Sequence, residues 1–254
     1  MRDWKPVVGV LAVLAIVIGF VVAANQLTKP KPLDPVASAS ATDSTALPTA
    51  SSAPTPTVTP SLLAGCTPVP AGPTAPKRMT TKPDLEGARG RTFIATLTTN
   101  CGPVTVELDG AKAPATVSSF LLLAKESYWA GTTCHRLTIE GIWVLQCGDP
   151  TGTGSGPGPG YHFGIENAPA DGIYPRGTIA MARTSDPDSN TDQFFIVYKD
   201  TTLPTQGGGY TIFGKVTGGM EIIDKIAAAG VLPSDGMTPL APIGFVSVSV
   251  QPKA

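Results

Sequence analysis

Between Arg91 and Gln251 the sequence is a series of short apolar runs separated by glycine and proline turns. RTFIATLTTN and VTVELD flank a turn at Asn100-Cys101-Gly102-Pro103, and CHRL, IWVLQC, GTIAMA, QFFIVY, YTIFGKV and FVSVSV follow. Short runs rich in β-branched and aromatic residues, bounded by turn residues, are typical of strands in antiparallel sheets. The pattern predicts a mainly β domain, built as a closed or nearly closed antiparallel barrel.

Two segments of this region have helical spacing instead. KAPATVSSFLLLAKESY follows a helix start signal at Pro114, and GGMEIIDKIAAAG stops at Gly230. Apolar residues that recur every three or four positions indicate one buried face on each helix. The predicted inward residues are Val117, Phe120, Leu121 and Ala124 on the first, and Ile222, Ile223 and Ile226 on the second. We expect these two helices to cover the ends of the barrel.

The N-terminus carries a candidate membrane segment. Residues 1–6 include Arg2 and Lys5, and residues 7–24 are eighteen uncharged, mostly apolar residues. Such a run just spans a hydrocarbon core of roughly 30 Å, which favours a retained transmembrane anchor with residues 1–6 in the cytoplasm. A cleaved signal peptide ending near Ala24 is the alternative. In both cases the rest of the chain is exported. With a retained anchor the protein is a single-pass cell-membrane protein with an extracytoplasmic C-terminal domain, and after cleavage it is secreted.

Residues 25–85 are dominated by proline, serine, threonine and alanine, as in SASATDSTALPTASSAPTPTVTP. A segment with so few large apolar residues cannot bury enough surface to offset the entropy of ordering it. We therefore expect a disordered linker over 25–85 and a folded domain over 86–254.

Charge and cysteine usage exclude several classes of function. The formal net charge is -1 and lysine and arginine do not cluster, so nucleic-acid binding is not expected. The cysteines form no CxxC pair and there are only two histidines, which disfavours a metal site. In an exported chain, an even number of cysteines indicates disulfides. Of the three possible pairings, Cys134 with Cys147 is favoured because they lie at the ends of one predicted hairpin, which leaves Cys66 with Cys101.

The usual catalytic motifs are also missing from the sequence. GTGSGPGPG, from Gly152 to Gly160, leads into Tyr-His-Phe rather than a helix, so we interpret it as a flexible surface loop and not a phosphate-binding loop. No GxSxG motif occurs. Four loop carboxylates are interpreted as solvated or turn residues: Asp149, Glu166, Asp186 and Asp188. We expect no metal, no cofactor and no covalent intermediate.

Three longer motifs remain: HRLTIEGIWVLQCGDP, MARTSDPDSNTDQFFI and YTIFGKVTGGMEIIDKI. Together, and in this order, they resemble the cyclophilin family of peptidyl-prolyl cis-trans isomerases, over about Arg91 to Gln251. The resemblance is greatest to exported, membrane-anchored bacterial members. It implies a closed, eight-stranded antiparallel β-barrel capped by two helices, and an enzyme that rotates X-Pro bonds of exported proteins without a cofactor.

The resemblance also assigns residues. Arg136 corresponds to the family's catalytic arginine, and Gln146 to the glutamine that helps to hold the substrate carbonyl. The proline pocket corresponds to Trp143, Met181, Phe195 and Leu203. Further contacts with the bound peptide fall on Ala182, Arg183, Gln193 and Tyr210. His135 matches a histidine that is a structural neighbour of the arginine.

Some positions depart from the family pattern. The turn between Arg136 and Gln146 is two residues longer than in the commonest members, and Trp143 replaces a phenylalanine. Thr202 stands where many members have the tryptophan that binds cyclosporin, and Tyr210 where a histidine is common, so cyclosporin binding is expected to be weak at most. The expected partners are proline-containing polypeptides, and the chain is expected to be a monomer. The alternatives are a module of the same fold that binds proline-containing segments or cell-envelope partners without turnover, and a disulfide-exchange protein.

Overall fold

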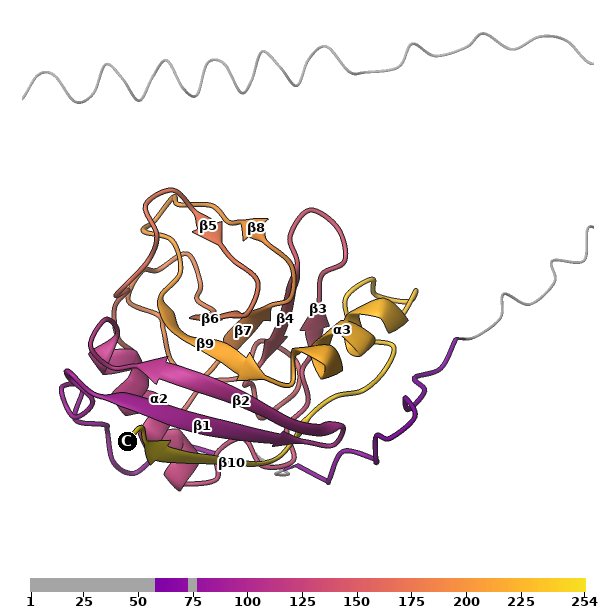
Figure 1. Cartoon of the computed structure of the whole chain (residues 1–254), viewed down its shortest axis with the longest axis horizontal. Coiled ribbons are helices and arrows are strands. Elements are labelled where there is room, and N and C mark those ends of the chain that lie inside the picture. Colours follow the sequence, from indigo (N-terminus) through magenta and orange to yellow (C-terminus); the bar gives the residue numbers. More distant parts are fainter. Residues whose placement is uncertain (1–57, 73–76) are drawn as a thin grey trace, which may run out of the picture. The chain divides into compact units, whose positions relative to one another are not determined.

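A computed structural model describes residues 58–72 and 77–254 (Figure 1). The predicted cytoplasmic N-terminus, the membrane segment 7–24 and most of the predicted linker lie outside these residues. Within the two described ranges, no helix has the length and apolar character needed to cross a bilayer.

The regular structure after Arg91 is one large antiparallel sheet with two helices packed against it, and a separate two-stranded pair (Figure 1). The eight strands of the large sheet follow the order β10-β1-β2-β9-β6-β7-β4-β3, and β5 and β8 pair separately. The strands are β1 (Thr92–Thr99), β2 (Gly102–Asp109), β3 (Arg136–Leu137), β4 (Val144–Cys147), β5 (Ile173–Tyr174), β6 (Thr178–Met181), β7 (Phe194–Val197), β8 (Thr201–Thr202), β9 (Ile212–Gly218) and β10 (Phe245–Pro252). The helices are α2 (Pro114–Lys125) and α3 (Met220–Ala229).

The sheet curls, but its two edge strands do not pair with each other in the described part of the chain. The edges are β10 and β3, and the segments just before them meet at one bridge, Thr133 with Gly244. Nearby, the amide N–H of Cys134 donates to Ile243 and that of Phe245 to Thr132, each over 2.9 Å. The mainly β prediction is thus confirmed, whereas a fully closed barrel is not seen, because β3 is only two residues long.

The two helices begin and end close to the positions that the sequence predicts. Pro114 occupies the first turn of α2, and Gly230 ends α3 with a positive φ of 84°, a conformation that glycine adopts without strain. α2 packs against β2 and β10, and α3 packs against β2. On the predicted faces, Leu121 and Ile222 are only partly buried, while their neighbours Leu123 and Ile223 are buried in the core.

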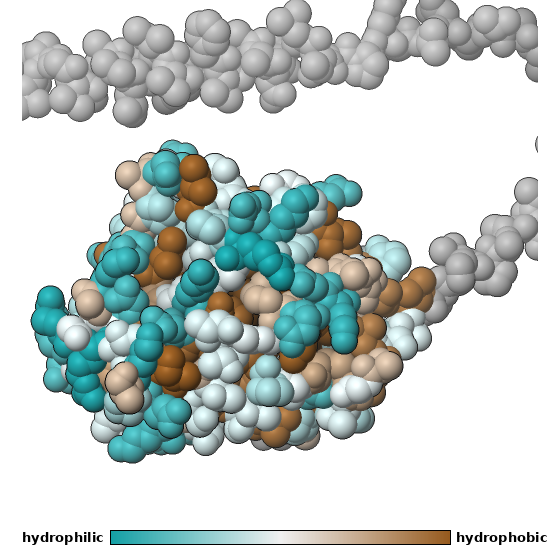
Figure 2. All heavy atoms as spheres, viewed as in Figure 1, coloured by the Kyte–Doolittle hydropathy of each residue, from teal (hydrophilic) through white to brown (hydrophobic). Residues whose placement is uncertain are grey.

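The main core lies between the curled sheet and α2. Aromatic rings dominate its centre: Phe120 contacts Trp129 with ring centroids 4.6 Å apart, and Phe194 lies 5.7 Å from Trp129. Rings of this size bury much apolar area, so this cluster contributes strongly to stability. On the surface shown in Figure 2, hydrophobic residues are scattered among hydrophilic ones rather than gathered in one broad patch.

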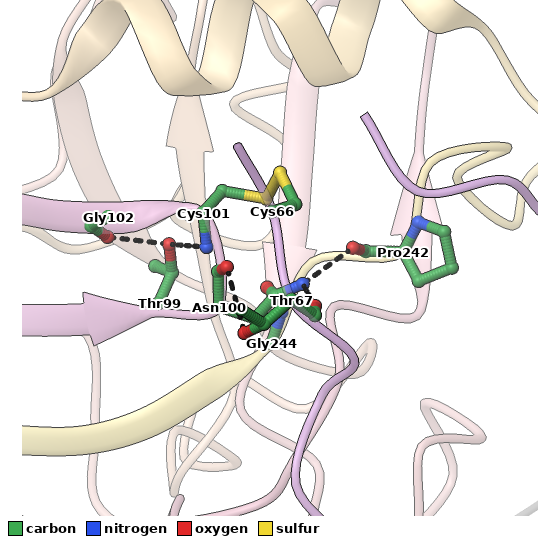
Figure 3. Close-up of a disulfide and its surroundings, with 8 residues drawn as sticks. All are labelled: Cys66, Thr67, Thr99, Asn100, Cys101, Gly102, Pro242 and Gly244. Carbon is green, nitrogen blue, oxygen red and sulfur yellow. Dashed lines mark hydrogen bonds between the residues drawn. A yellow bond between two sulfur atoms is a disulfide. The ribbon is translucent and has the colours of Figure 1, made fainter. Parts of the chain in front are cut away.

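Part of the predicted linker is attached to the domain. We call residues 58–72 and 77–85 the arm. Cys66 of the arm forms a disulfide with Cys101, and the side-chain amide of Asn100 donates to Thr67 and Pro242 while its oxygen accepts from Gly244 (Figure 3). This differs from a free linker over 25–85. Composition does not reveal this attachment, because it rests on one disulfide, on hydrogen bonds to distant segments and on three apolar side chains, Leu63, Met79 and Leu85, that pack against the core.

Candidate active site

Strands β4 and β7 divide their side chains between two faces. The register pairs Val144 with Val197 and Gln146 with Phe195, and because side chains alternate along a strand, all four point to the same side. Leu145, Cys147, Phe194 and Ile196 point to the other side and join the main core. The first face therefore lies outside the main core and is available for a separate site.

A second apolar cluster lies on this face, and we call it the outer cluster. Tyr210 leans edge-on against Phe195 with ring centroids 5.7 Å apart, and its backbone N–H donates to the hydroxyl of Tyr174 over 2.8 Å. Ile142, Ala182, Tyr210 and Ile212 are partly buried against it. The buried members of the outer cluster are Val144, Tyr174, Ala180, Phe195, Val197 and Leu203.

Polar side chains from three strands or strand ends meet beside the outer cluster. Arg136 of β3 is directly opposite Gln146 of β4, and its Nη1 lies 3.4 Å from Gln146 Oε1. Gln146 Nε2 donates to Gln193 Oε1 over 3.0 Å, and Gln193 Nε2 donates to the carbonyl of Gly154 over 3.2 Å. The predicted residues Arg136, Gln146 and Gln193 are thus brought together. Each side chain is only partly buried, so a bound molecule can reach it.

A groove of about 540 Å³ continues from these polar side chains. Gln146 and Gln193 line one part, Ala182 and Arg183 another, and the glycine-rich loop at 154–158 closes it. The guanidinium of Arg183 lies 5.0 Å from the ring centroid of Tyr210 and donates to the carbonyl of Gly209 over 2.7 Å. The predicted contacts Ala182, Arg183 and Gln193 therefore line this groove. Ala182 and Tyr210 pack against the outer cluster, to which Phe195 and Leu203 belong.

Two predicted members of the proline pocket lie elsewhere. Trp143 points toward Tyr198, with ring centroids 6.2 Å apart, and Lys199 Nζ lies 4.2 Å from its ring. Met181 is paired with Phe194 and is buried in the main core. Side chains alternate between the two sides of a strand. Trp143 and Met181 are next in sequence to Val144 and Ala180, which belong to the outer cluster, and therefore point away from it. Val144 and Ala180 belong to the outer cluster instead, and the two-residue step from Gln146 back to Val144 was the signal in the sequence.

Of the two predicted alternatives for Asp149, solvated or turn residue, the structure supports the turn residue: the Gly152 N–H donates to the Asp149 carbonyl, but the carboxylate is not solvated. It is fully buried and accepts hydrogen bonds from the backbone N–H groups of Thr151 and Gly156 over 2.8 and 3.0 Å. Burial opposes its charge, but these bonds and that from the Thr151 hydroxyl outweigh it and lower the pKa of Asp149. The carboxylate therefore fixes the glycine-rich loop that was predicted to be flexible. Glu166 accepts from Ala115 and Thr116 at the start of α2, while Asp186 and Asp188 are exposed.

His135 lies directly before Arg136 and is a buried neighbour, as the resemblance implied. Its side chain is 9% exposed and neither ring nitrogen has a hydrogen-bond partner among the described residues. Burial lowers the pKa of His135, Asp149 raises it and Arg136 lowers it further. The imidazole is therefore held in its neutral form, and the cationic group beside Gln146 is Arg136.

The chemistry open to this site follows from its groups. A permanently charged donor and two amides lie next to an apolar cluster and are only partly buried. All four cysteines of the chain are paired, as Cys66–Cys101 and Cys134–Cys147, which is the pairing that the hairpin argument favoured. Over residues 58–72 and 77–254, no three His, Cys, Asp or Glu side chains gather as potential metal ligands.

Comparisons with known proteins agree with this geometry. Residues 94–250 match the profile of the family described as "Cyclophilin type peptidyl-prolyl cis-trans isomerase/CLD". A "Probable peptidyl-prolyl cis-trans isomerase B" of Mycobacterium tuberculosis is 43% identical over 150 residues, which cover 53% of this chain and 46% of that protein. A "Peptidyl-prolyl cis-trans isomerase" of Helicobacter pylori is 40% identical over 146 residues, which cover 57% of this chain and 86% of that protein.

The chain thus spans about half the length of the mycobacterial relative. Among solved structures, a cyclophilin-type peptidyl-prolyl cis-trans isomerase of Cryptosporidium parvum, crystallised in the presence of the dipeptide Ala-Pro, is 30% identical with a TM-score of 0.53. The match covers 62% of this chain and 98% of that structure. The family profile covers more than half of the chain and the site residues lie within it, so the chain belongs to the cyclophilin-type peptidyl-prolyl cis-trans isomerase family.

Proposed function

We propose that this chain catalyses cis–trans isomerisation of X-Pro bonds in proline-containing polypeptides. One observation carries the proposal: Arg136, Gln146 and Gln193 form a connected series beside an apolar cluster that contains Phe195 and Leu203. The names of its relatives and the Ala-Pro dipeptide of the Cryptosporidium structure support the same substrate class.

The reaction needs no bond to be made or broken. Its barrier of about 18–20 kcal/mol is the loss of amide resonance on rotation, and without a catalyst it takes tens to hundreds of seconds. When the amide twists, the prolyl nitrogen gains a lone pair that can accept a hydrogen bond. In this proposal the guanidinium of Arg136 donates that bond. The planar ground state offers no such acceptor, so this interaction stabilises the transition state selectively.

The other groups hold the substrate on either side of the rotating bond. We assign the proline ring to Val144, Phe195 and Leu203 of the outer cluster, and the carbonyl of the preceding residue to Gln146 and Gln193. Trp143 and Met181 lie outside this cluster. In the proposal they do not contact the substrate and only support the packing around the site. No proton transfer at His135 is required, because the reaction moves no proton.

We also propose that the domain acts outside the cytoplasm, tethered to the cell membrane through residues 7–24, and assists the folding of exported proteins as a monomer. The uncharged run after Arg2 and Lys5 supports the tether. Pairing of all four cysteines supports an oxidising compartment. Thr202, exposed at the position of the family's cyclosporin-binding tryptophan, supports weak cyclosporin affinity. Fractionation of cells that carry the full chain tests the location, and a cytosolic pool of the protein would contradict it.

The catalytic proposal is tested with the purified full chain and its Arg136→Ala and Arg136→Lys variants. Isomerisation of a short X-Pro peptide is followed in a protease-coupled assay. We expect kcat/KM to fall about 100-fold in Arg136→Ala, mainly through kcat, because one donor to a developing charge is worth about 10²–10³ in rate. Arg136→Lys should be intermediate, since a lysine keeps the charge but not the planar donor geometry.

Two results would contradict the proposal: no acceleration by the unmodified chain, or full activity in Arg136→Ala. Peptide binding by the unmodified chain, measured by titration calorimetry, without any acceleration would support the non-catalytic binding module instead.

A further inference from the structure

The hairpin that carries Arg136 and Gln146 has the shortest ladder of the large sheet. β3 and β4 share only two residue pairs, Arg136 with Gln146 and Leu137 with Leu145. β3 is an edge strand, so β4 is its only partner in the sheet. β4 itself is firmly placed by four residue pairs with β7. The position of Arg136 relative to Gln146 therefore depends on how well β3 is held against β4.

At the far end of this hairpin, the hold rests on a few hydrogen bonds at Leu137 and Thr138, among them the Leu137 N–H to Met237 and the Tyr198 hydroxyl to Thr138. The Thr138 hydroxyl accepts from the backbone N–H of Val144 over 3.0 Å, and Thr138 N–H donates to the carbonyl of Val144 over the same distance. Beyond Thr138 the turn is exposed at Ile139, Glu140 and Gly141. The Nη1 to Oε1 contact between Arg136 and Gln146, at 3.4 Å, is too long to fix the guanidinium by itself.

At the near end, a disulfide joins Cys134, two residues before Arg136, to Cys147, one residue after Gln146. Their Cα atoms are 4.0 Å apart, and the residues are 4% and 0% exposed. Cys147 is the last residue of β4 and is paired with Phe194 of β7. The bond therefore ties the start of the edge strand covalently to a strand that is fixed inside the sheet.

We propose that the Cys134–Cys147 disulfide is a positioning element for catalysis, which holds Arg136 in register with Gln146 and the outer cluster. This inference rests on the proposed function. A guanidinium that must meet the prolyl nitrogen only in the twisted state has a narrow range of useful positions, and a misplacement of about 1 Å can cost about 100-fold in rate. The two remaining ladder pairs retain part of the geometry, so we expect about a tenfold loss of kcat/KM without the disulfide.

The chain contains its own control in the Cys66–Cys101 disulfide. That bond joins the arm to the turn between β1 and β2, and neither cysteine lines the groove beside Gln146 and Gln193. Both disulfides constrain the unfolded chain, so a general effect of stability acts on both. A loss of turnover confined to the Cys134–Cys147 pair distinguishes positioning from stability.

The experiment compares Cys134→Ala/Cys147→Ala with Cys66→Ala/Cys101→Ala in the full chain, each with Arg136 intact and with Arg136→Ala. Circular dichroism identifies a temperature at which all variants are folded, and kcat and KM are measured there. We expect the first pair to lose about tenfold in kcat with KM little changed, and the second pair to change by less than about twofold. In the Arg136→Ala background, removal of Cys134–Cys147 should cause no further loss, because the disulfide acts through Arg136.

If the double alanine variant does not fold, Cys134→Ala/Cys147→Val, which refills part of the buried volume, is measured in its place. Unchanged kcat without the disulfide overturns the inference, as does an equal loss in both Arg136 backgrounds or an equal loss on removal of Cys66–Cys101. Failure of the proposed function looks different, since the unmodified, oxidised chain would then be inactive.

Discussion

The two hairpins of the large sheet are stabilised in opposite ways. β1 and β2 share eight residue pairs around a two-residue loop, Asn100-Cys101, and each has a further strand on its outer side. β3 and β4 share two pairs, and β3 has no further strand partner in the part of the chain that the structure describes. Each hairpin uses a cysteine, but Cys101 reaches outward to the arm, whereas Cys134 and Cys147 join the two strands of their own hairpin.

The difference shows where rigidity comes from in each case. A long ladder inside a sheet needs no crosslink, so the cysteine in its turn can hold a segment that has little apolar surface. A short hairpin at a sheet edge has few backbone bonds and belongs to the less stable part of the molecule. Two of the residues assigned to catalysis, Arg136 and Gln146, lie on this second hairpin, where the proposal makes local order depend on the crosslink.

The largest expected effect tests the β1–β2 hairpin as the stability centre. Leu97 is fully buried between β2 and β10. Leu97→Ala removes this packing and should lower the free energy of unfolding by about 3 kcal/mol, measured by urea denaturation. Ile139→Ala in the exposed turn of the other hairpin should cost less than about 0.5 kcal/mol. At a temperature where Leu97→Ala is folded, kcat/KM should be unchanged, and a large loss there would break the separation between the two hairpins.

A smaller effect of pH should act on the β3–β4 hairpin through His135. Burial, with Arg136 adding to it and Asp149 opposing it, lowers the pKa of His135 in the folded protein. The stability linked to the neutral ring is therefore complete above the unfolded pKa, about 6.5, and is lost as pH falls below it. The free energy of unfolding should be lower at pH 5.5 than at pH 7.5, and this decrease should be larger for the unmodified chain than for His135→Gln. The excess decrease is at most about 1.4 kcal/mol per pH unit, because one proton is involved.

Comparison with His135→Gln isolates this effect from other groups. Burial raises the pKa of Asp192, so its contribution to stability changes with pH in the opposite direction, but it is present in both proteins. Equal pH dependence of the two proteins would show that His135 is not held neutral by the fold.

The smallest expected effect concerns the two disulfides. They close segments with sequence separations of 35 and 13 residues. Loop entropy predicts that removal of Cys66–Cys101 lowers the free energy of unfolding by about 0.9 kcal/mol more than removal of Cys134–Cys147. Removal of Cys66–Cys101 should therefore cost more stability, measured by urea denaturation of the paired alanine variants. Removal of Cys134–Cys147 should cost more turnover, measured as kcat. If the same disulfide mattered more for both stability and turnover, the two hairpins would not differ in the way proposed.

Local patterns in the sequence predict much of this fold. The β1–β2 turn, the start of α2 at Pro114 and the end of α3 at Gly230 follow from residue types and spacing alone. The arm does not, because its position depends on bonds to segments distant in sequence. Asp149 does not either, although its partners Thr151 and Gly156 lie close to it in sequence. The buried carboxylate of Asp149 is stable only because a loop of small residues closes around it, and no local pattern reveals that closure.

The candidate site was predicted in part. The motifs identify Arg136, Gln146, Gln193 and Phe195, and the structure brings these together. Motif matching placed Trp143 in the apolar wall, where Val144 is found, because it compares residue types at positions and takes no account of the face to which a side chain points. Counting in steps of two from Gln146 identifies Val144.

The pairing of β10 with β1 has a consequence for how the chain folds. Phe93 lies opposite Pro252, so the first strand of the sheet is completed only by the last. During synthesis, β1 leaves the ribosome long before its partner, and its outer edge has no β10 to pair with until residues 245–252 have been made. Pairings this far apart in sequence fold slowly, and an unpaired edge invites association with other chains. For this domain the interval between the first and the last strand is therefore the time of greatest risk of aggregation, and the protein itself is expected to need protection during it.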